Sequence, residues 1–412
     1  MEQSGQYRPY LSWIESQQNA MRDMVHAWAE INSWSRNPDG LARMVDAVET
    51  EFTALRGTSE RLNLSVHSLP ETLEIEDAPR LGDALRIRKR PGAPVRVFLC
   101  CHMDTVYPPD HPFQGVSLID GNTLRGPGVA DAKGGIVVML KALEALELSP
   151  WAENVGWEVL VNPDEEIGSP GSGMLLKEAA TRHHVGLVFE PCFPDGSIVG
   201  PRKGSGNFTV MARGRAAHAG REPHLGRNAV SGVAWFVVLL NAFAASQKGI
   251  TVNVGYIEGG GPVNVVPDKA ECRFNVRVNS RENLLLIEDY FTRVIATVSL
   301  VEGISLEKHG FFQRQPKPLD SSWQWLLEAV VECGSALGLD LQWRESGGAC
   351  DGNNLNAEGL PTVDSLGVRG GDLHSPSEYV LLHSLAERAK LAALFLMKLA
   401  SGEIVVPPAR TS

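Results

Sequence analysis

The stretch WEVLVNPDEEIG, residues 157–168, joins an apolar run directly to a row of three acidic residues. Adjacent side chains of a continuing β-strand point to opposite faces of the sheet, so a strand would not place Asp164, Glu165 and Glu166 on one side. Two interpretations are open at this point. The acidic row is either a solvated turn, or the strand ends there so that two carboxylates can face one cavity. The choice depends on what the rest of the chain places nearby.

Helix-like and strand-like segments alternate on both sides of this stretch. Apolar spacing predicts helices at residues 9–34 and 136–146, from residue 321, and from 377 to 400. Buried-strand patterns occur at residues 96–106, 157–162, 185–191 and 361–366. Strands that are separated by helices predict an α/β fold with a largely parallel sheet.

The pattern changes after Gly204. Strands are predicted at residues 207–214, 251–260, 269–279 and 304–312, and helices at 226–245 and 282–298. The resulting order βαββαβ fits a small split-βαβ (ferredoxin-like) domain with one sheet and two helices. Because the α/β pattern returns after Pro316, we expect an inserted domain at 204–316, with residues 1–203 and 317–412 forming one larger domain.

Composition excludes several classes of protein. With 412 residues the chain exceeds the usual single-domain range, and its formal net charge of -11 argues against a nucleic-acid or anionic-membrane partner. The first residues lack the basic and apolar regions of a signal peptide. The apolar run at 230–245 is interrupted and shorter than a membrane span, so we interpret it as a buried helix. Six cysteines without a CxxC spacing suit buried thiols, and we predict a cytoplasmic location.

Five clusters of polar residues follow strands or turns of the α/β part. They are CHMDT with His102 and Asp104, GPGVADAKGG with Asp131, NPDEEIG with Glu165 and Glu166, FEP with Glu190, and GDLHSPSEY with His374. Ligands of open α/β sheets bind beyond the carboxyl ends of the strands, so we expect the clusters to meet in one crevice. Two histidines and several carboxylates suit divalent ions such as Zn²⁺, Mn²⁺ or Co²⁺.

Each of these residues also has a simpler interpretation when taken alone. His102 could be a histidine satisfied within the core, and Asp131 could cap the helix that follows it. Cys101 is interpreted as a buried strand residue rather than a thiolate ligand. GPGVADAKGG has neither the GxxxxGK[ST] nor the GxGxxG form of a phosphate loop. The chain has no GxSxG elbow and no HExxH, which argues against those two kinds of hydrolytic site.

Taken together and in this order, the motifs resemble the M20 family of co-catalytic metallopeptidases, in particular its glutamate carboxypeptidase-like branch with aminoacylase relatives. The matching motifs, from about residue 96 to 385, are HMDTV, GVADAKGG, DEEIGS, FEP, AAHAG, NVVPDKAECRFNVR and LHSPSEYV. The resemblance implies a zinc-peptidase catalytic domain that is split in sequence around an inserted lid or dimerisation domain. It also implies two divalent metal ions, zinc in the first instance, with manganese or cobalt as alternatives.

The resemblance implies a metal ligand set. His102 and Glu190 would bind one ion, Glu166 and His374 would bind the other, and Asp131 would bridge the two.

It also implies roles around the metals. Asp104 would orient the ring of His102, as partners of ligand histidines commonly do, and Glu165 would be the general base. In the insert, His218 would reach the substrate carbonyl oxygen with help from Asn264, and Arg277 would bind the free carboxylate of the substrate in bidentate fashion. In several family members the lid histidine comes from the neighbouring subunit.

These roles predict a dinuclear-metal hydrolase that cleaves an amide or peptide bond next to a free carboxylate, using metal-bound hydroxide and a glutamate base. The expected reaction is carboxypeptidase-like, releasing glutamate or another C-terminal amino acid. Two alternatives stay open, an N-acyl amino acid deacylase or dipeptidase of the same fold, and a non-catalytic metal-binding homologue. The expected partners are a small peptide or N-acyl amino acid and a second copy bound through the insert. The role of loop 346–355 is left open, and Asp164 is expected to serve the turn or support the ligands.

Overall fold

A six-stranded sheet forms the centre of the large lobe in the computed structural model, which describes residues 5–64 and 80–407. The strands, in spatial order, are β1 (Thr58–Leu62), β2 (Ala84–Lys89), β6 (Val155–Asn162), β3 (Val95–His102), β7 (Val185–Val188) and β14 (Thr362–Val363). β3 pairs in parallel with β6 and β7, and β14 pairs in parallel with β7. β2 is antiparallel to both of its neighbours, β1 and β6. The predicted α/β fold with a largely parallel sheet is therefore confirmed.

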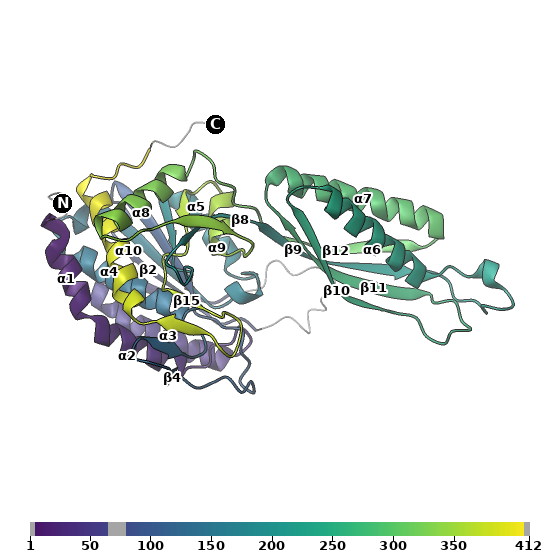
Figure 1. The fold of residues 1–412 in the computed structure, drawn as a ribbon, viewed down its shortest axis with the longest axis horizontal. Helices are drawn as coiled ribbons and strands as arrows, with labels where there is room; N and C mark the ends of the chain where they lie inside the picture. Colours follow the sequence, from purple (N-terminus) through teal and green to yellow (C-terminus); the bar gives the residue numbers. More distant parts are fainter. Residues whose placement is uncertain (1–4, 65–79, 408–412) are drawn as a thin grey trace.

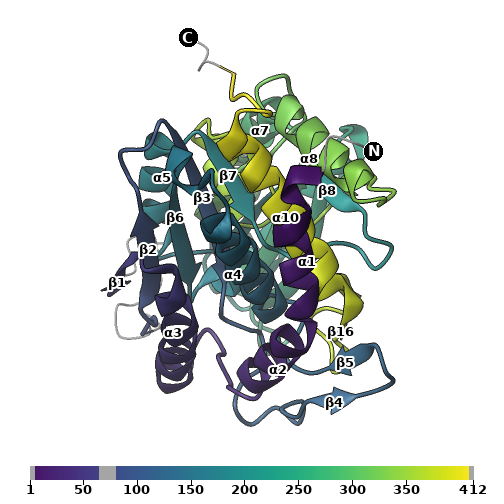
Figure 2. The same ribbon diagram turned by 90° about the vertical axis from the view of Figure 1, so that its left-hand side faces the viewer.

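Helices cover both faces of this sheet. One face packs on α1 (Arg8–Ser16), α2 (Gln18–Ala29), α3 (Pro38–Phe52), α4 (Lys133–Leu148), α8 (Gln324–Ala336) and α10 (His383–Ser401). The other face packs on α5 (Gly173–Arg182) and α9 (Asp351–Ala357). Successive residues of β3 divide between the two cores, because Leu99 and Cys101 belong to the first and Phe98 and Cys100 to the second. Figure 2 shows α1, α4 and α10 together in front of the sheet.

Short strands complete the large lobe. β4 (Ser117–Leu118), β5 (Thr123–Arg125), β15 (Gly370–Gly371) and β16 (Tyr379–Leu381) form a second sheet, and β8 (Ile198–Arg202) pairs with β13 (Trp343–Ser346). The prediction of one helix over 377–400 was wrong at its start, because residues 379–381 pair with β5 and α10 begins at His383. The helix predicted over 9–34 was too long, because Ser33 and Ser35 hydrogen-bond the segment that follows β3.

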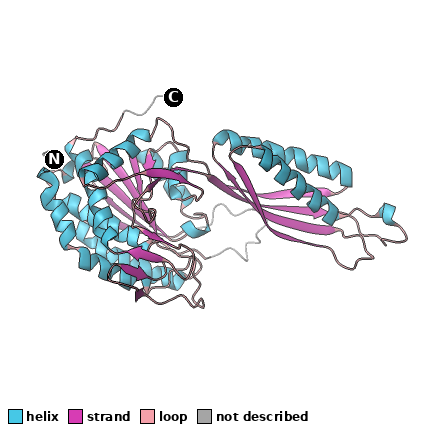
Figure 3. Cartoon of the chain, viewed as in Figure 1, coloured by secondary structure: helices cyan, strands magenta, loops and turns pink. Residues whose placement is uncertain are grey.

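The insert is a four-stranded antiparallel sheet with two helices on one face (Figures 1 and 3). Its elements are β9 (Gly204–Arg213), α6 (Ala229–Ser246), β10 (Ile250–Gly259), β11 (Lys269–Val278), α7 (Arg281–Glu302) and β12 (Ser305–Arg314). The spatial order is β10-β11-β9-β12, so the βαββαβ order is the predicted one. The insert projects away from the large lobe, which holds both ends of the described chain (Figure 1).

Helix α6 is only partly buried, contrary to the prediction of a buried helix. Val233, Phe236 and Leu240 face the insert core, whereas Trp235 and Val238 are 52% and 58% exposed. Within residues 5–64 and 80–407, α6 is the one helix long and apolar enough to cross a membrane, and 33% of it is buried. A helix of a soluble core passes the same test, so this is weak evidence for a membrane.

Three adjacent strand ends meet at one edge of the large sheet. β3 ends at His102, β6 ends two residues before Asp164, and β7 ends two residues before Glu190. Helix α4 starts at the same edge and lies close to β7, since a Cβ atom at Gly135 would be 1.9 Å from the Phe189 carbonyl oxygen. Because Gly135 has no Cβ atom, the first turn of α4 can approach the strand ends closely, and Asp131, which precedes this helix, is brought near them as well.

Candidate metal centre

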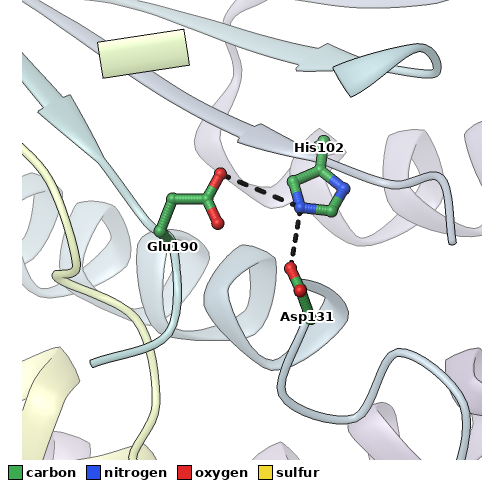
Figure 4. A group of neighbouring side chains, drawn as sticks. All are labelled: His102, Asp131 and Glu190. Carbon is green, nitrogen blue, oxygen red and sulfur yellow. Dashed lines mark hydrogen bonds and ion pairs between the residues drawn. The ribbon is translucent and has the colours of Figure 1, made fainter. Parts of the chain in front are cut away.

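A first group of possible metal ligands lies at the end of β3. His102 Nε2 is 3.0 Å from Asp131 Oδ1 and 3.8 Å from Glu190 Oε1. Both carboxylates point at the same ring nitrogen (Figure 4). Only 2% of His102 and 8% of Asp131 is exposed, so the three groups face one another rather than solvent.

A second group shares Asp131 with the first. His374 Nε2 is 3.2 Å from Asp131 Oδ2 and 3.1 Å from Glu166 Oε2. Asp131 thus offers one oxygen to each histidine. It does not cap α4, since that helix has no side-chain cap at its N-terminus.

These two groups fit a pair of divalent cations. In each group one histidine and two carboxylates place ligand atoms within 4.8 Å of one another, and Asp131 belongs to both. Imidazole and carboxylate donors suit Zn²⁺, Mn²⁺ and Co²⁺. Cys101 lies next to His102 but donates to the carbonyl oxygens of Ala132 and Phe189, so it remains a buried strand residue as predicted.

Asp104 connects the first histidine to the acidic turn. His102 Nδ1 is 3.0 Å from the Asp104 backbone oxygen and 3.4 Å from its carboxylate. The same carboxylate accepts hydrogen bonds from the backbone amides of Glu165 and Glu166 and from the hydroxyl of Ser35. Asp104 therefore fixes the ring orientation and the turn that bears the two glutamates.

Glu165 belongs to neither metal group. Its Oε1 accepts a hydrogen bond from Arg314 Nη2 at 3.0 Å, and burial raises the pKa of its carboxyl to about 7. Asp164 accepts hydrogen bonds from the amides of Gly171 and Ser172, so it serves the turn as expected. The row of three acids thus divides into one residue of the turn, one candidate base and one candidate ligand.

The predicted residues of the insert lie in two places. Arg277, near the end of β11 next to the large lobe, donates from Nη1 to the Gly347 carbonyl oxygen at 2.7 Å. His218 and Asn264 are exposed and lie in loops beyond the other end of the sheet. A hydrogen bond from the Ala219 amide to the Asn264 carbonyl oxygen joins the two loops. The ten residues of β9 separate the two ends by about 30 Å. A single chain therefore does not bring His218 and Asn264 to the metal ligands.

Residues 98–398 match the model of peptidase family M20/M25/M40. The chain belongs to this family. It is a metal-dependent hydrolase.

The M20 peptidase is similar to enzymes of more than one specificity. It is 29% identical over 334 residues to carboxypeptidase G2 of Pseudomonas sp. (strain RS-16), covering 78% of each chain. It is 26% identical over 302 residues to succinyl-diaminopimelate desuccinylase of Nitrosospira multiformis, covering 67% of this chain and 75% of that one. The fold is similar to that of a dinuclear metal-binding M20 peptidase from Bacillus subtilis, with TM-score 0.66, 17% identity, and 93% and 99% of the two chains covered.

The sequence did not reveal how the M20 peptidase holds the Asp131 loop. Glu378 is buried and accepts hydrogen bonds from the amides of Gly128, Ala130 and Asp131 and from the hydroxyl of Tyr107. Glu378 lies within the SPSEY motif four residues after His374, so it connects the two loops that supply the second ligand group. The only feature of the sequence that pointed to Glu378 was an acidic residue within the motif that contains His374.

Protons compete for this centre in the metal-free protein. Burial raises the pKa of Glu166 to about 8, and hydrogen bonds to Asp131 and Glu166 raise the pKa of His374 to about 11. Although burial opposes it, Glu190 and Asp131 also raise the pKa of His102 well above its usual value.

We therefore expect metal affinity to rise between pH 6 and pH 8. A carboxyl or imidazole that is protonated below its pKa has to lose that proton before it can coordinate, so affinity should rise about tenfold per pH unit for each proton displaced. Calorimetric titration of the metal-free protein with Zn²⁺, in two buffers of different ionisation enthalpy, measures the number of protons released. An affinity that is the same at pH 6 and pH 8 would contradict this.

Proposed function

We propose that the protein hydrolyses an amide or peptide bond next to a free carboxylate and releases a C-terminal amino acid, such as glutamate. The observation that supports this most directly is the pair of ligand groups that share Asp131, with Glu165 beside them and in neither group. A protein that only stores metal has no use for a buried, unligated carboxylate next to its ligands. This argues against the non-catalytic alternative.

The proposed reaction assigns a task to each group. Divalent ions bound by His102, Asp131, Glu166, Glu190 and His374 would supply Lewis acidity that polarises the amide carbonyl and acidifies water. Glu165 would accept the proton of the attacking water and deliver it to the leaving amine, and a carboxyl with a pKa of about 7 suits both steps. Arg277 would bind the free carboxylate of the substrate with its planar fork. Zinc is the proposed native metal.

We propose the domain division 1–203, 204–316 and 317–412, with the middle part as lid and dimerisation domain. His218 and Asn264 lie far from the ligands of their own chain, so they would complete the site of a second copy by binding the carbonyl oxygen as charge develops there. A cytoplasmic location is proposed as well. It is supported by six buried cysteines, none of which forms a disulfide within the described residues.

A hydrolysis screen tests the proposed function. The purified protein is incubated with N-acyl amino acids and dipeptides in the presence of Zn²⁺, Mn²⁺ or Co²⁺, and the released amino acid is quantified. Release of glutamate from N-acyl-glutamates would support the carboxypeptidase-like reaction. Preference for neutral dipeptides, or for a succinylated diamino acid of the kind that the Nitrosospira relative is named for, would replace it with one of the two alternatives.

The proposed homodimer is expected to depend on Trp235. Its side chain is 52% exposed on α6, which packs against β10, a strand with a neighbour on one side only within the described residues, so this face offers apolar surface beside an open sheet edge. Buried interface tryptophans commonly account for about 2 kcal/mol or more of association energy. Trp235→Lys should therefore convert a dimer to a monomer at micromolar concentration, as measured by sedimentation velocity.

Leu300→Lys is the matched control for Trp235→Lys. Leu300 is 85% exposed on α7, the other helix of the insert, which packs beside β12 rather than β10. This variant should remain dimeric. A wild-type protein that sediments as a monomer at micromolar concentration would refute the dimer itself.

A further inference from the structure

Two chain segments connect the insert to the large lobe, and they are joined side by side. Residue Arg202 precedes β9 and Lys317 follows β12, and their backbones exchange hydrogen bonds of 2.9 and 3.0 Å. The buried carboxylate of Asp364 pairs with both side chains, at 2.8 Å from Arg202 Nη2 and 2.8 Å from Lys317 Nζ. This clamp makes the root of the insert a fixed part of the large lobe.

Arg314 lies at this root and points into the acidic turn. It is the last residue of β12 and is only 4% exposed. Its Nη2 lies 3.0 Å from Glu165 Oε1, 3.0 Å from Asp351 Oδ1 and 2.7 Å from Ser169 Oγ. One guanidinium nitrogen of the insert therefore contacts the candidate base and the groups that surround it.

Asp351 is the second carboxylate that pairs with Arg314 Nη2. It is 2% exposed, and its Oδ2 accepts a hydrogen bond of 2.7 Å from Asn162, the last residue of β6. Its Oδ1 accepts a hydrogen bond from the Ser169 hydroxyl. The other two partners of Arg314 are thus held in place: Asp351 is bound to Asn162 of β6, and Ser169 is bound to Asp351. The guanidinium therefore has little freedom to move.

We propose that Arg314 is the positioning residue for Glu165, a role that rests on the proposed function of Glu165 as general base. Glu165 begins the short 3-10 turn Glu165–Ile167 rather than lying on a strand, so regular backbone pairing does not fix its side chain. A charge-assisted hydrogen bond from a guanidinium that Asp351 immobilises supplies the missing constraint. Arg314 acts on the reaction through Glu165 and does not itself touch the substrate.

The rival role for a buried arginine beside the site is direct binding of a substrate carboxylate. Nη1 of Arg314 is buried and has no hydrogen-bond partner among the described residues, so the guanidinium retains a donor. The two roles differ in kinetics. Loss of a positioning residue lowers kcat, whereas loss of a substrate ligand that binds ground and transition states alike raises KM.

The test compares Arg314→Met with the wild type by kinetics, metal content and crystal structure. A misplacement of a catalytic group by about 1 Å costs about 100-fold in rate, so kcat should fall about 100-fold while KM stays within about threefold. Metal content should stay at two ions per chain. In the crystal structure the Glu165 carboxylate should leave its wild-type position, with the five metal ligands unmoved.

Two further variants keep this test interpretable. Arg314→Lys retains the buried positive charge, so it should fold even if Arg314→Met does not, and its smaller loss of kcat should come without loss of metal. Arg90→Met removes a partly buried ion pair with Glu147 in a different part of the lobe and should leave kcat unchanged. A raised KM with unchanged kcat, or a Glu165 carboxylate that stays in place, would overturn the proposal. If the wild type hydrolyses nothing, the proposed function fails, and the Glu165 position in the variant structure still decides the role of Arg314.

Discussion

Glu165→Gln is expected to lower turnover by about 10² to 10⁴-fold, the range that general acid–base catalysis contributes. Glutamine keeps the length and the hydrogen-bonding oxygen of the side chain, so the contact with Arg314 Nη2 can persist. An amide cannot accept the proton of the attacking water, so the substitution removes the proposed chemistry and little else.

The same variant should keep both metal ions. Glu165 is in neither ligand group. The turn around it is held by hydrogen bonds that the backbone amides of Glu165 and Glu166 donate to the Asp104 carboxylate. Metal content by inductively coupled plasma mass spectrometry and kcat on the best substrate of the hydrolysis screen measure the two effects separately. A variant that loses metal and activity together would show that Glu165 supports the ligands rather than the proton transfer.

Glu158→Gln is the matched control. Glu158 lies on β6, the strand that leads into the acidic turn, and is 5% exposed, but it pairs with Arg182 instead of facing the metal ligands. This variant makes the same chemical change on the strand that precedes the turn and should leave kcat close to its wild-type value. If Glu165→Gln retained comparable activity, another residue would have to act as the base.

The convergence of three of the five proposed ligands could be predicted from the sequence because these three directly follow strands. His102 ends β3, Glu166 follows β6 and Glu190 follows β7, and parallel strands bring these ends to one edge. The strand pattern thus places three proposed ligands without knowledge of any side-chain contact. Asp131 and His374 do not end strands of the main sheet, so the strand pattern places them less directly, and the ligand roles of all five residues rested on the family resemblance.

The supporting contacts could not be predicted, because they join residues that no local pattern relates. Arg314 and Glu165 are 149 positions apart, and Glu378 and Asp131 are 247 positions apart. A buried ion pair requires both partners to be known, and a single arginine at the end of a strand has the same local pattern as a surface arginine. Short strands such as β16 were missed for a related reason, since three residues are too few to show a periodicity.

Asp131→Asn is expected to reduce the metal content from two ions per chain to one and to lower activity by at least about 100-fold. The two carboxylate oxygens of Asp131 face different histidines, Oδ1 toward His102 and Oδ2 toward His374. An asparagine amide has one oxygen, and its NH₂ group cannot coordinate a cation. Because loss of a supporting partner alone costs 10- to 100-fold in metal affinity, loss of a direct ligand should cost more.

Asp120→Asn is the control for this change. Asp120 is exposed and accepts hydrogen bonds from the amides of Asn122 and Thr123 in a surface turn, so this variant should keep two ions per chain. Mass spectrometry of the metals and calorimetric titration with Zn²⁺ give the stoichiometry for both variants. Two tightly bound ions in Asp131→Asn would refute a shared ligand.

The ion that Asp131→Asn retains should be the one bound by His102 and Glu190. The His102 side chain is 1% exposed and is oriented by Asp104, whereas the His374 side chain is 54% exposed. A preorganised, buried pair of ligands loses less freedom on binding, so the amide oxygen should serve that side. Adding His374→Ala to Asp131→Asn should then leave one ion per chain, while adding His102→Ala should remove it. The opposite result would mean that the more exposed group binds metal more tightly.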